Sequence, residues 1–270
     1  SIRLPASFCG AVGLKPTYGL VSRYGVVAMA SSTDVIGPIT RTTADAGVVL
    51  DVMAGVDAKD STTIVRETSY LVSDSIKPVK VGVVKEFLGD GIEPAVKEAV
   101  LYTIDVLKQQ GHEIVELSLP SISLALAAYY IIVPAEISSN LSRYDGQRYG
   151  FSKSDAKDLY ESFSGSRGIG FNAENKGRIM IGTYVLLRGD YDAYYKKAAK
   201  IRTKLITEFE SAFKLVDFLV GPTAPMTAFK IGENADDPLQ MYLADIMTVA
   251  INLVGVPAIS IPSKDTEGMP

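Results

Sequence analysis

The sequence has very few of the residues that carry thiolate or histidine chemistry. Its 270 residues include one cysteine, Cys9, and one histidine, His112. A single cysteine excludes a disulfide within these residues, and one Cys with one His cannot supply the ligands of an ordinary zinc site. A lone cysteine in an apolar context is usually a small core residue, so we expect Cys9 to be buried. The sparse cysteine also indicates a reducing compartment, and the cytoplasm is the expectation.

A serine hydrolase of the Ser-His-Asp type would have to use His112. This histidine directly follows Gly111, where a helix is expected to end and a strand to begin, and no nucleophile-elbow pattern accompanies it. We therefore expect a surface or packing role for His112. Any hydrolytic chemistry in this chain has to work without histidine.

Concentrated positive charge and long hydrophobic runs are also missing. The net charge is -4, the pI is near 5.2, and Lys and Arg are scattered. A basic face that holds nucleic acid by itself is therefore not expected. The most apolar stretch, residues 122–133, leads into Pro134 and Glu136 and is shorter than the roughly 20 residues that a membrane span needs. No interaction with a membrane is expected.

Hydrophobic periodicity and turn residues predict an α/β fold. The strand–helix–strand order over residues 79–119 predicts two parallel strands with a right-handed crossover. Residues 1–40 are rich in Gly, Pro and Ser and predict ordered loops with short strands. The alternation as a whole predicts one domain with a mixed β-sheet and helices on both of its faces. The expected helices cover residues 42–55, 94–111, 123–143, 155–163, 175–187, 191–213 and 238–253, and the expected strands cover residues 79–84, 112–119, 216–220 and 257–261.

A series of motifs occupies the first 62 residues in a fixed order. The motifs are Ser-Ile-Arg-Leu-Pro-Ala at 1–6, Cys-Gly at 9–10, Gly-Leu-Lys-Pro-Thr-Tyr-Gly at 13–19, Ser-Thr-Asp-Val-Ile-Gly-Pro at 32–38 and Asp-Ser-Thr at 60–62. Together they resemble the signature segment of the amidase-signature family. The resemblance implies the amidase-signature fold without its N-terminal part. Residues 1–270 are then expected to be the C-terminal portion of a single amidase domain, truncated at both ends.

The resemblance also implies the chemistry. In this family the serine that opens the Ser-Ile-Arg segment forms the acyl-enzyme, and here that serine is Ser1. The family's base is a buried lysine whose pKa is lowered, acting through a second serine held by a cis peptide bond. Backbone N–H groups form the oxyanion hole. The lysine and the second serine would lie upstream of residue 1, and Lys15 does not match the position of the lysine. We therefore expect the chain by itself to be inactive.

Further segments outside the signature resemble one subfamily, the A subunits of the tRNA-dependent amidotransferases. In that subfamily, an arginine and an aspartate bind the carboxylate and the ammonium of glutamine, and a tyrosine lines the pocket. The resemblance carries these roles to Arg178, Asp245 and Tyr129, with Tyr130 as the alternative tyrosine. Gly177 departs from the pattern, because the subfamily usually has a second basic residue there. The matching segments cover residues 135–146, 178–184, 191–195, 221–225 and 237–245.

The residue types agree with these roles. A guanidinium can bind both oxygens of a carboxylate. Asp245, Thr248 and Asn252 fall on one polar stripe of an otherwise apolar helix, and a carboxylate in such a place needs a partner. By its pattern alone the stripe would be a solvent-facing edge or a structural salt bridge.

The expected function is that of a glutamine amidohydrolase, one component of a larger complex. Ser1 would attack the side-chain amide of glutamine, and the released ammonia would travel to a partner, the B subunit, which amidates Glu-tRNA(Gln) or Asp-tRNA(Asn). The resemblance also implies a small third component, the C subunit, and places the tRNA mainly on the B subunit. Because ATP and magnesium belong to the partner's chemistry, no cofactor and no metal are expected in this chain.

Three other interpretations remain open at this point. The chain could belong to a stand-alone amidase that acts on another small amide. Ser1 could instead be an N-terminal nucleophile with its own α-amine as base, since the pKa of that amine is about 7.7 to 8.0. The chain could also be an inactive fragment that serves as a scaffold.

Overall fold

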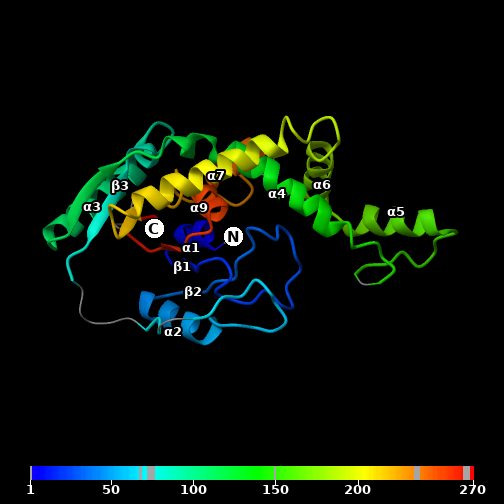
Figure 1. The fold of residues 1–270 in the computed structure, drawn as a ribbon, viewed down its shortest axis with the longest axis horizontal. Coiled ribbons are helices and arrows are strands. Elements are labelled where there is room, and N and C mark those ends of the chain that lie inside the picture. The colour runs from blue at the N-terminus through cyan, green and yellow to red at the C-terminus, as the bar shows by residue number, and fades with distance from the viewer. Residues whose placement is uncertain (1, 67–68, 72–76, 149, 234–237, 264–267) are drawn as a thin grey trace. The chain divides into compact units, whose positions relative to one another are not determined.

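The computed structural model describes residues 2–66, 69–71, 77–148, 150–233, 238–263 and 268–270 (Figure 1). The chain divides into two compact units. Unit 1 comprises Ser1–Gly25, Val35–Leu126 and Arg202–Pro270, and unit 2 comprises Val26–Asp34 and Ala127–Ile201. Each unit has its own buried hydrophobic cluster. The expectation of a single domain stays a prediction.

The first sheet of unit 1 is antiparallel. Strand β1 (Val12–Lys15) lies between β2 (Ile39–Thr40) and β6 (Ala258–Ser260). Helix α1 (Arg3–Phe8) packs against β1 and β6 (Figure 1). The approach is so close that a Cβ atom at Gly13 would lie 2.6 Å from the Cβ atom of Ala6. Glycine is therefore required on β1 where it meets the helix.

Helix α1 was not among the elements expected over residues 1–40. It is six residues long and contains Pro5. Proline is tolerated there because N–H groups in the first turn of a helix have no intrahelical acceptor. Such a short helix shows too few turns for its periodicity to be recognised in the sequence.

Helix α2 (Thr43–Met53) confirms the expected capped helix. Thr42 is the N-cap, and its Oγ1 accepts a hydrogen bond from the backbone N–H of Asp45 at 3.1 Å. The helix buries Leu50 against Leu20 and Val21, which form one core cluster of unit 1.

The second sheet of unit 1 is parallel and confirms the expected βαβ unit. Strand β3 (Lys80–Val84) lies between β4 (Glu113–Leu117) and β5 (Phe218–Val220). The short 3₁₀ helix η1 (Lys85–Leu88) follows β3, and α3 (Pro94–Gln109) makes the crossover to β4 and lies along the sheet (Figure 1).

His112 has the packing role that the sequence predicted. Its Nδ1 accepts a hydrogen bond from the backbone N–H of Val79 at 3.2 Å, beside the start of the strand pair β3–β4.

The α/β class is confirmed, and the strands form two sheets of three strands each. Among the described strands no ladder joins the antiparallel sheet to the parallel one. Strand pairing depends on contacts between segments far apart in the chain, so the number of sheets could not be read from local patterns.

The helix expected over residues 238–253 is interrupted. Helix α8 (Pro238–Ala244) ends just before Asp245, and α9 (Ile246–Val254) begins just after it. Gly255 ends α9 in the left-handed conformation, at φ 87°, and its N–H bonds to the carbonyl of Ile251. Asp245 is therefore the residue at the junction of two helices.

Unit 2 is helical. Its elements are most of α4 (Ala125–Leu141), α5 (Leu159–Gly170), α6 (Ala173–Val185) and the start of α7 (Tyr195–Ala212). The core cluster consists of Ala30, Val133, Ile137 and Leu141, with Tyr129, Tyr144, Phe171 and Ile179 packed against it. The expected helices in this region are present, with ends that differ by a few residues.

The apolar segment around α4 is longer than the sequence analysis expected, because Pro134 lies inside the helix without ending it. The helical segment Pro120–Leu141, which includes the 3₁₀ turn η2 (Pro120–Leu124), is long and apolar enough to cross a membrane by length and composition. Half of its most apolar window is buried inside the protein. A helix of a packed protein core passes the same test.

The expectation that Cys9 is buried was wrong. Cys9 is exposed at the C-terminal end of α1, where its backbone N–H bonds to the carbonyls of Pro5 and Ala6. The helix buries Arg3 and Ala6 instead. The apolar neighbours of Cys9 in the sequence did not determine which face it occupies.

Gly182 offers a test of the packing between α6 and α4. A Cβ atom at this position would lie 1.9 Å from the carbonyl oxygen of Pro134, so Gly182→Ala forces the helices apart. We expect the free energy of unfolding to fall by about 1–3 kcal/mol. The measurement is urea unfolding of the complete gene product.

Gly177 on the same helix is the matched control. A Cβ atom there meets nothing within 4 Å. Alanine is the better helix former, so Gly177→Ala should raise stability by up to about 1 kcal/mol. Equal effects of the two substitutions would contradict the packing of α6 on α4.

Candidate functional site

Ser1, the predicted nucleophile, lies outside the described residues, so its role stays a prediction. The segment that follows it is well defined. Ile2 caps α1, and Arg3 is the first residue of the helix. The side chain of Arg3 is the first polar group after the nucleophile whose surroundings the structure describes.

Arg3 is buried and reaches across to α9. It is 8% exposed, and its Nη2 donates to the carbonyl oxygen of Thr248 at 2.9 Å and to Oδ1 of Asn252 at 2.5 Å. Burial lowers the pKa of Arg3 to about 10, and the negative charge of Asp245 acts against this by raising it. Arg3 therefore links the start of α1 to the start and the middle of α9.

The polar stripe predicted on residues 245–252 is present, and its three members all interact with Arg3. Thr248 and Asn252 accept its hydrogen bonds, and Asp245 attracts its charge. The backbone of Asp245 is also fixed, because its carbonyl oxygen accepts from Thr248 N at 2.9 Å and from Thr248 Oγ1 at 3.0 Å. The positive charge of Arg3 therefore lies near enough to half-buried Asp245 for the two charges to attract each other.

Lys15 is a second buried cation beside Arg3. It lies on β1, is 3% exposed, and donates from Nζ to the carbonyl oxygen of Pro16 at 2.9 Å. Burial, followed by the positive charge of Arg3, lowers the pKa of Lys15 to about 8. The sequence analysis assigned Lys15 no role, although it lies inside the signature motif.

Arg178 and the two candidate tyrosines come together in unit 2. The side chain of Arg178 on α6 is 18% exposed, and its guanidinium carbon lies 5.8 Å from the centre of the Tyr130 ring. Tyr129 and Tyr130 pack edge to face, with ring centres 5.3 Å apart. Arg178 is therefore not an ordinary exposed surface arginine.

Glu174 holds one side of the Arg178 guanidinium. Nε of Arg178 donates to Oε1 of Glu174 at 2.5 Å, one helical turn away. Burial is the largest single influence and acts to lower the pKa of Arg178, but the hydrogen bond and the charge of Glu174, together with Tyr129 and Tyr130, raise this pKa overall. Among the described residues the two Nη groups have no hydrogen-bond acceptor, so they can donate to a ligand. Glu174 was missed by sequence reasoning, and its spacing of four residues from Arg178 is the signal that could have identified it.

The predicted site residues fall in different units. Arg178 and Tyr129 are in unit 2, and Asp245 is in unit 1. The structure brings Arg178 together with the tyrosines and Asp245 together with Arg3. The joint action of Arg178 and Asp245 on one ligand stays a prediction.

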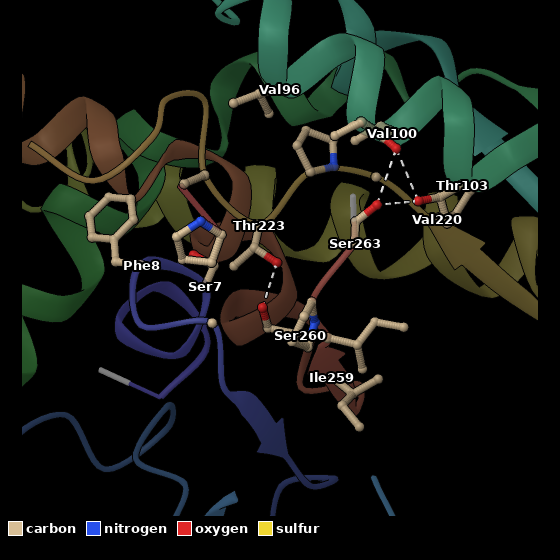
Figure 2. A pocket seen from close by; sticks show the side chains of 18 of the residues that line it. Ser7, Phe8, Val96, Val100, Thr103, Val220, Thr223, Ile259, Ser260 and Ser263 are labelled. Carbon is tan, nitrogen blue, oxygen red and sulfur yellow. Dashed lines mark hydrogen bonds between the residues drawn. The ribbon is translucent and has the colours of Figure 1, made fainter. Parts of the chain in front are cut away.

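Unit 1 contains a cavity of about 370 Å³ (Figure 2). Its walls include Phe8, Val100 and Ile259 and are largely apolar. Four of its hydroxyls bond in pairs, since Thr223 Oγ1 lies 3.0 Å from Ser260 Oγ and Thr103 Oγ1 lies 2.6 Å from Ser263 Oγ (Figure 2). Of the predicted site residues that the structure describes, Arg178, Tyr129 and Asp245 are not among those that line this cavity.

Metal ligation has no visible basis in the part of the chain that the structure describes. There, no group of three or more His, Cys, Asp or Glu side chains could hold a metal ion.

Comparison with known proteins places the chain in a family. The model of the Amidase family matches residues 1–270, and the chain belongs to this family. It is 56% identical, over 274 aligned residues, to the A subunit of glutamyl-tRNA(Gln) amidotransferase from Caldanaerobacter subterraneus, covering 100% of this chain and 56% of the relative. The corresponding protein of Thermoanaerobacter pseudethanolicus is 55% identical with the same coverage.

A solved structure agrees with this assignment. The crystal structure of the A subunit of glutamyl-tRNA(Gln) amidotransferase from Thermotoga maritima matches with a TM-score of 0.80 and 40% identity, covering 100% of this chain and 54% of that one. These matches confirm the resemblance to the amidase-signature family and to the A subunits. The chain spans slightly more than half the length of the curated relatives it matches.

The contact between Arg3 and Asn252 can be tested by removing its acceptor. Asn252→Leu leaves one donor of a buried guanidinium without a partner. We expect the free energy of unfolding to fall by about 1.5–3 kcal/mol, the range for hydrogen bonds to charged groups. Thr248→Val is the comparison, because Arg3 bonds to the backbone carbonyl of Thr248, which remains. This variant loses only the neutral hydroxyl bond to the carbonyl oxygen of Asp245, so its loss should be smaller, about 1 kcal/mol. Chemical unfolding that shows equal losses in both variants would contradict this description.

Proposed function

We propose that this chain carries the nucleophile and the glutamine-binding residues of a glutaminase that supplies ammonia for tRNA-dependent transamidation. The observation that carries the proposal is the 56% identity, along the whole chain, to a protein named as the A subunit of glutamyl-tRNA(Gln) amidotransferase. The surroundings of Arg178 support it, because they prepare a guanidinium to bind a carboxylate.

The proposed reaction uses Ser1 as nucleophile. Its Oγ forms a bond to the side-chain carbonyl carbon of glutamine, and backbone N–H groups stabilise the oxyanion. The C–N bond then breaks, the amine leaves as ammonia with the proton taken from Ser1, and a glutamyl ester remains. Water hydrolyses this ester to glutamate and regenerates Ser1. The proposed base is the family's lysine, acting through a second serine, both upstream of residue 1.

The proposed pocket recognises both charged groups of glutamine. Glu174 occupies Nε of Arg178, so the two Nη groups can bind the two oxygens of the α-carboxylate. Tyr129 lines the pocket beside the guanidinium. Asp245 binds the α-ammonium.

We further propose that the complete protein acts with the B and C subunits of an amidotransferase and that the B subunit holds most of the tRNA. ATP and Mg²⁺ would serve the chemistry of that partner, and this chain would need no cofactor. The proposed location is the cytoplasm.

Substitution of Arg178 tests the pocket. We expect Arg178→Ala in the complete gene product to raise KM for glutamine about 10- to 100-fold, because a charge-assisted contact to the carboxylate is lost. Exposed Arg188 provides the control, and Arg188→Ala should leave KM unchanged. The measurement is ammonia release at varied glutamine concentration. An unchanged KM in Arg178→Ala would rule out this role.

Assays with the partner proteins test the wider proposal against a stand-alone amidase. We expect glutamine hydrolysis that increases when the B and C subunits and the acceptor tRNA are added, and that disappears in Ser1→Ala. Turnover of other small amides without turnover of glutamine would favour the stand-alone amidase, and no turnover of any amide would favour a scaffold.

A further inference from the structure

Arg3 and Lys15 form a pair of buried positive charges in unit 1. Arg3 is 8% exposed and Lys15 is 3% exposed. Side chains two apart on a strand share a face, so Lys15 points to the side of β1 on which Gly13 touches α1. The positive charge of Arg3 acts directly on Lys15. The two cations therefore lie close together between α1 and β1.

The two cations are unequally partnered. Arg3 has two hydrogen-bond acceptors on α9 and the nearby charge of Asp245. A lysine ammonium carries three N–H donors. Among the described residues, only the carbonyl oxygen of Pro16 accepts from Lys15, and no carboxylate forms an ion pair with it. The cluster thus holds two buried positive charges and one half-buried negative charge.

Such an imbalance is costly, because a buried charge without a partner is strongly disfavoured. A carboxylate is the group that would correct it, since it carries one negative charge and accepts several hydrogen bonds without needing a donor. The near-complete burial of Lys15 favours a carboxylate that is built into the protein over one that enters from solvent.

We propose that Arg3 and Lys15 together bind a second carboxylate, in addition to Asp245, and that an aspartate or glutamate of the polypeptide outside residues 1–270 supplies it. The relatives have room for such a residue, because this chain spans 56% of their length. The bound carboxylate fixes β1 and the first turn of α1, directly after Ser1. This site does not depend on the glutaminase proposal.

The test is thermal unfolding of the complete gene product with Lys15→Met, which removes the charge and keeps the length of the side chain. If a carboxylate pairs with Lys15, the substitution leaves that buried carboxylate without its lysine partner. Tm at about pH 7.5 should then fall by about 5 °C or more. Lys97→Met is the control, because Lys97 is exposed on α3, and it should leave Tm unchanged.

Without a partner carboxylate, the sign of the effect reverses. The pKa of Lys15 would then be lowered from 10.5 to about 8 in the folded protein. A lowered lysine pKa destabilises the folded state below pH 10.5, and fully so below about pH 8. Lys15→Met would then raise Tm at about pH 7.5, and a raised or unchanged Tm overturns the proposal.

The pH dependence of the loss in Tm distinguishes a buried carboxylate that has lost its lysine partner from a packing defect. In Lys15→Met, the carboxylate would have a raised pKa and become protonated as the pH falls, although Arg3 and Asp245 remain beside it. The loss of Tm relative to the unsubstituted protein should therefore shrink between about pH 7.5 and pH 5.5. A loss that is the same at both pH values indicates packing and overturns the proposal. If the variant is unfolded at about pH 7.5, it can be purified and first measured at about pH 5.5.

The source of the carboxylate is tested with sodium acetate against sodium chloride at matched ionic strength. If the carboxylate belongs to the polypeptide, we expect Lys15→Met to lower Tm equally in both salts. A loss that occurs only in acetate would show that the anion comes from solution, which overturns the assignment to the polypeptide.

Discussion

The burial of the Arg3 guanidinium is the constraint on which the arrangement of unit 1 depends. A buried guanidinium must find acceptors, and Arg3 finds them 245 and 249 positions further along the chain, on Thr248 and Asn252. These contacts hold α1 against α9. Strand β6 follows α9 and pairs with β1, which in turn packs on α1. The segment after Ser1 is therefore fixed by contacts with the far end of the chain.

The elements that were predicted correctly are those whose signals are local. Thr42 caps α2 through its own side chain, and Pro94 and Gly111 delimit α3 within a few residues. The interruption at Asp245 was missed because helical periodicity continues on both sides of it and no Gly or Pro marks a break. The backbone there bonds to Thr248, while the charge of the side chain acts on Arg3, and no local pattern encodes that second interaction. The division of the strands into two sheets was missed for the same reason.

Some features of the candidate site could be predicted from local patterns in the sequence, and others could not. Spacing alone predicted the stripe of Asp245, Thr248 and Asn252. In the structure, Arg3 bonds to the Asn252 side chain and the Thr248 backbone, and the charge of Asp245 acts on it. The roles of Arg178 and Tyr129 came from the family resemblance, because an arginine on a helix is ordinarily a surface residue. Glu174 lies one turn from Arg178 and could have been found by spacing. Arg3 and Lys15 could not be connected to a charge cluster from sequence, because their burial depends on how α1, β1 and α9 pack together.

His112, the one histidine of this sequence, has a packing role, so the proposed nucleophile Ser1 is proposed to work without it. Lys15 has a pKa of about 8 among the described residues, which by itself would suit a general base. A carboxylate beside it would raise that pKa and keep Lys15 protonated at neutral pH. The same interaction that stabilises the folded protein would then prevent Lys15 from accepting a proton. The general base would then have to be another group, which is consistent with the proposed lysine upstream of residue 1. The charge at Lys15 would instead hold the segment after Ser1 in place.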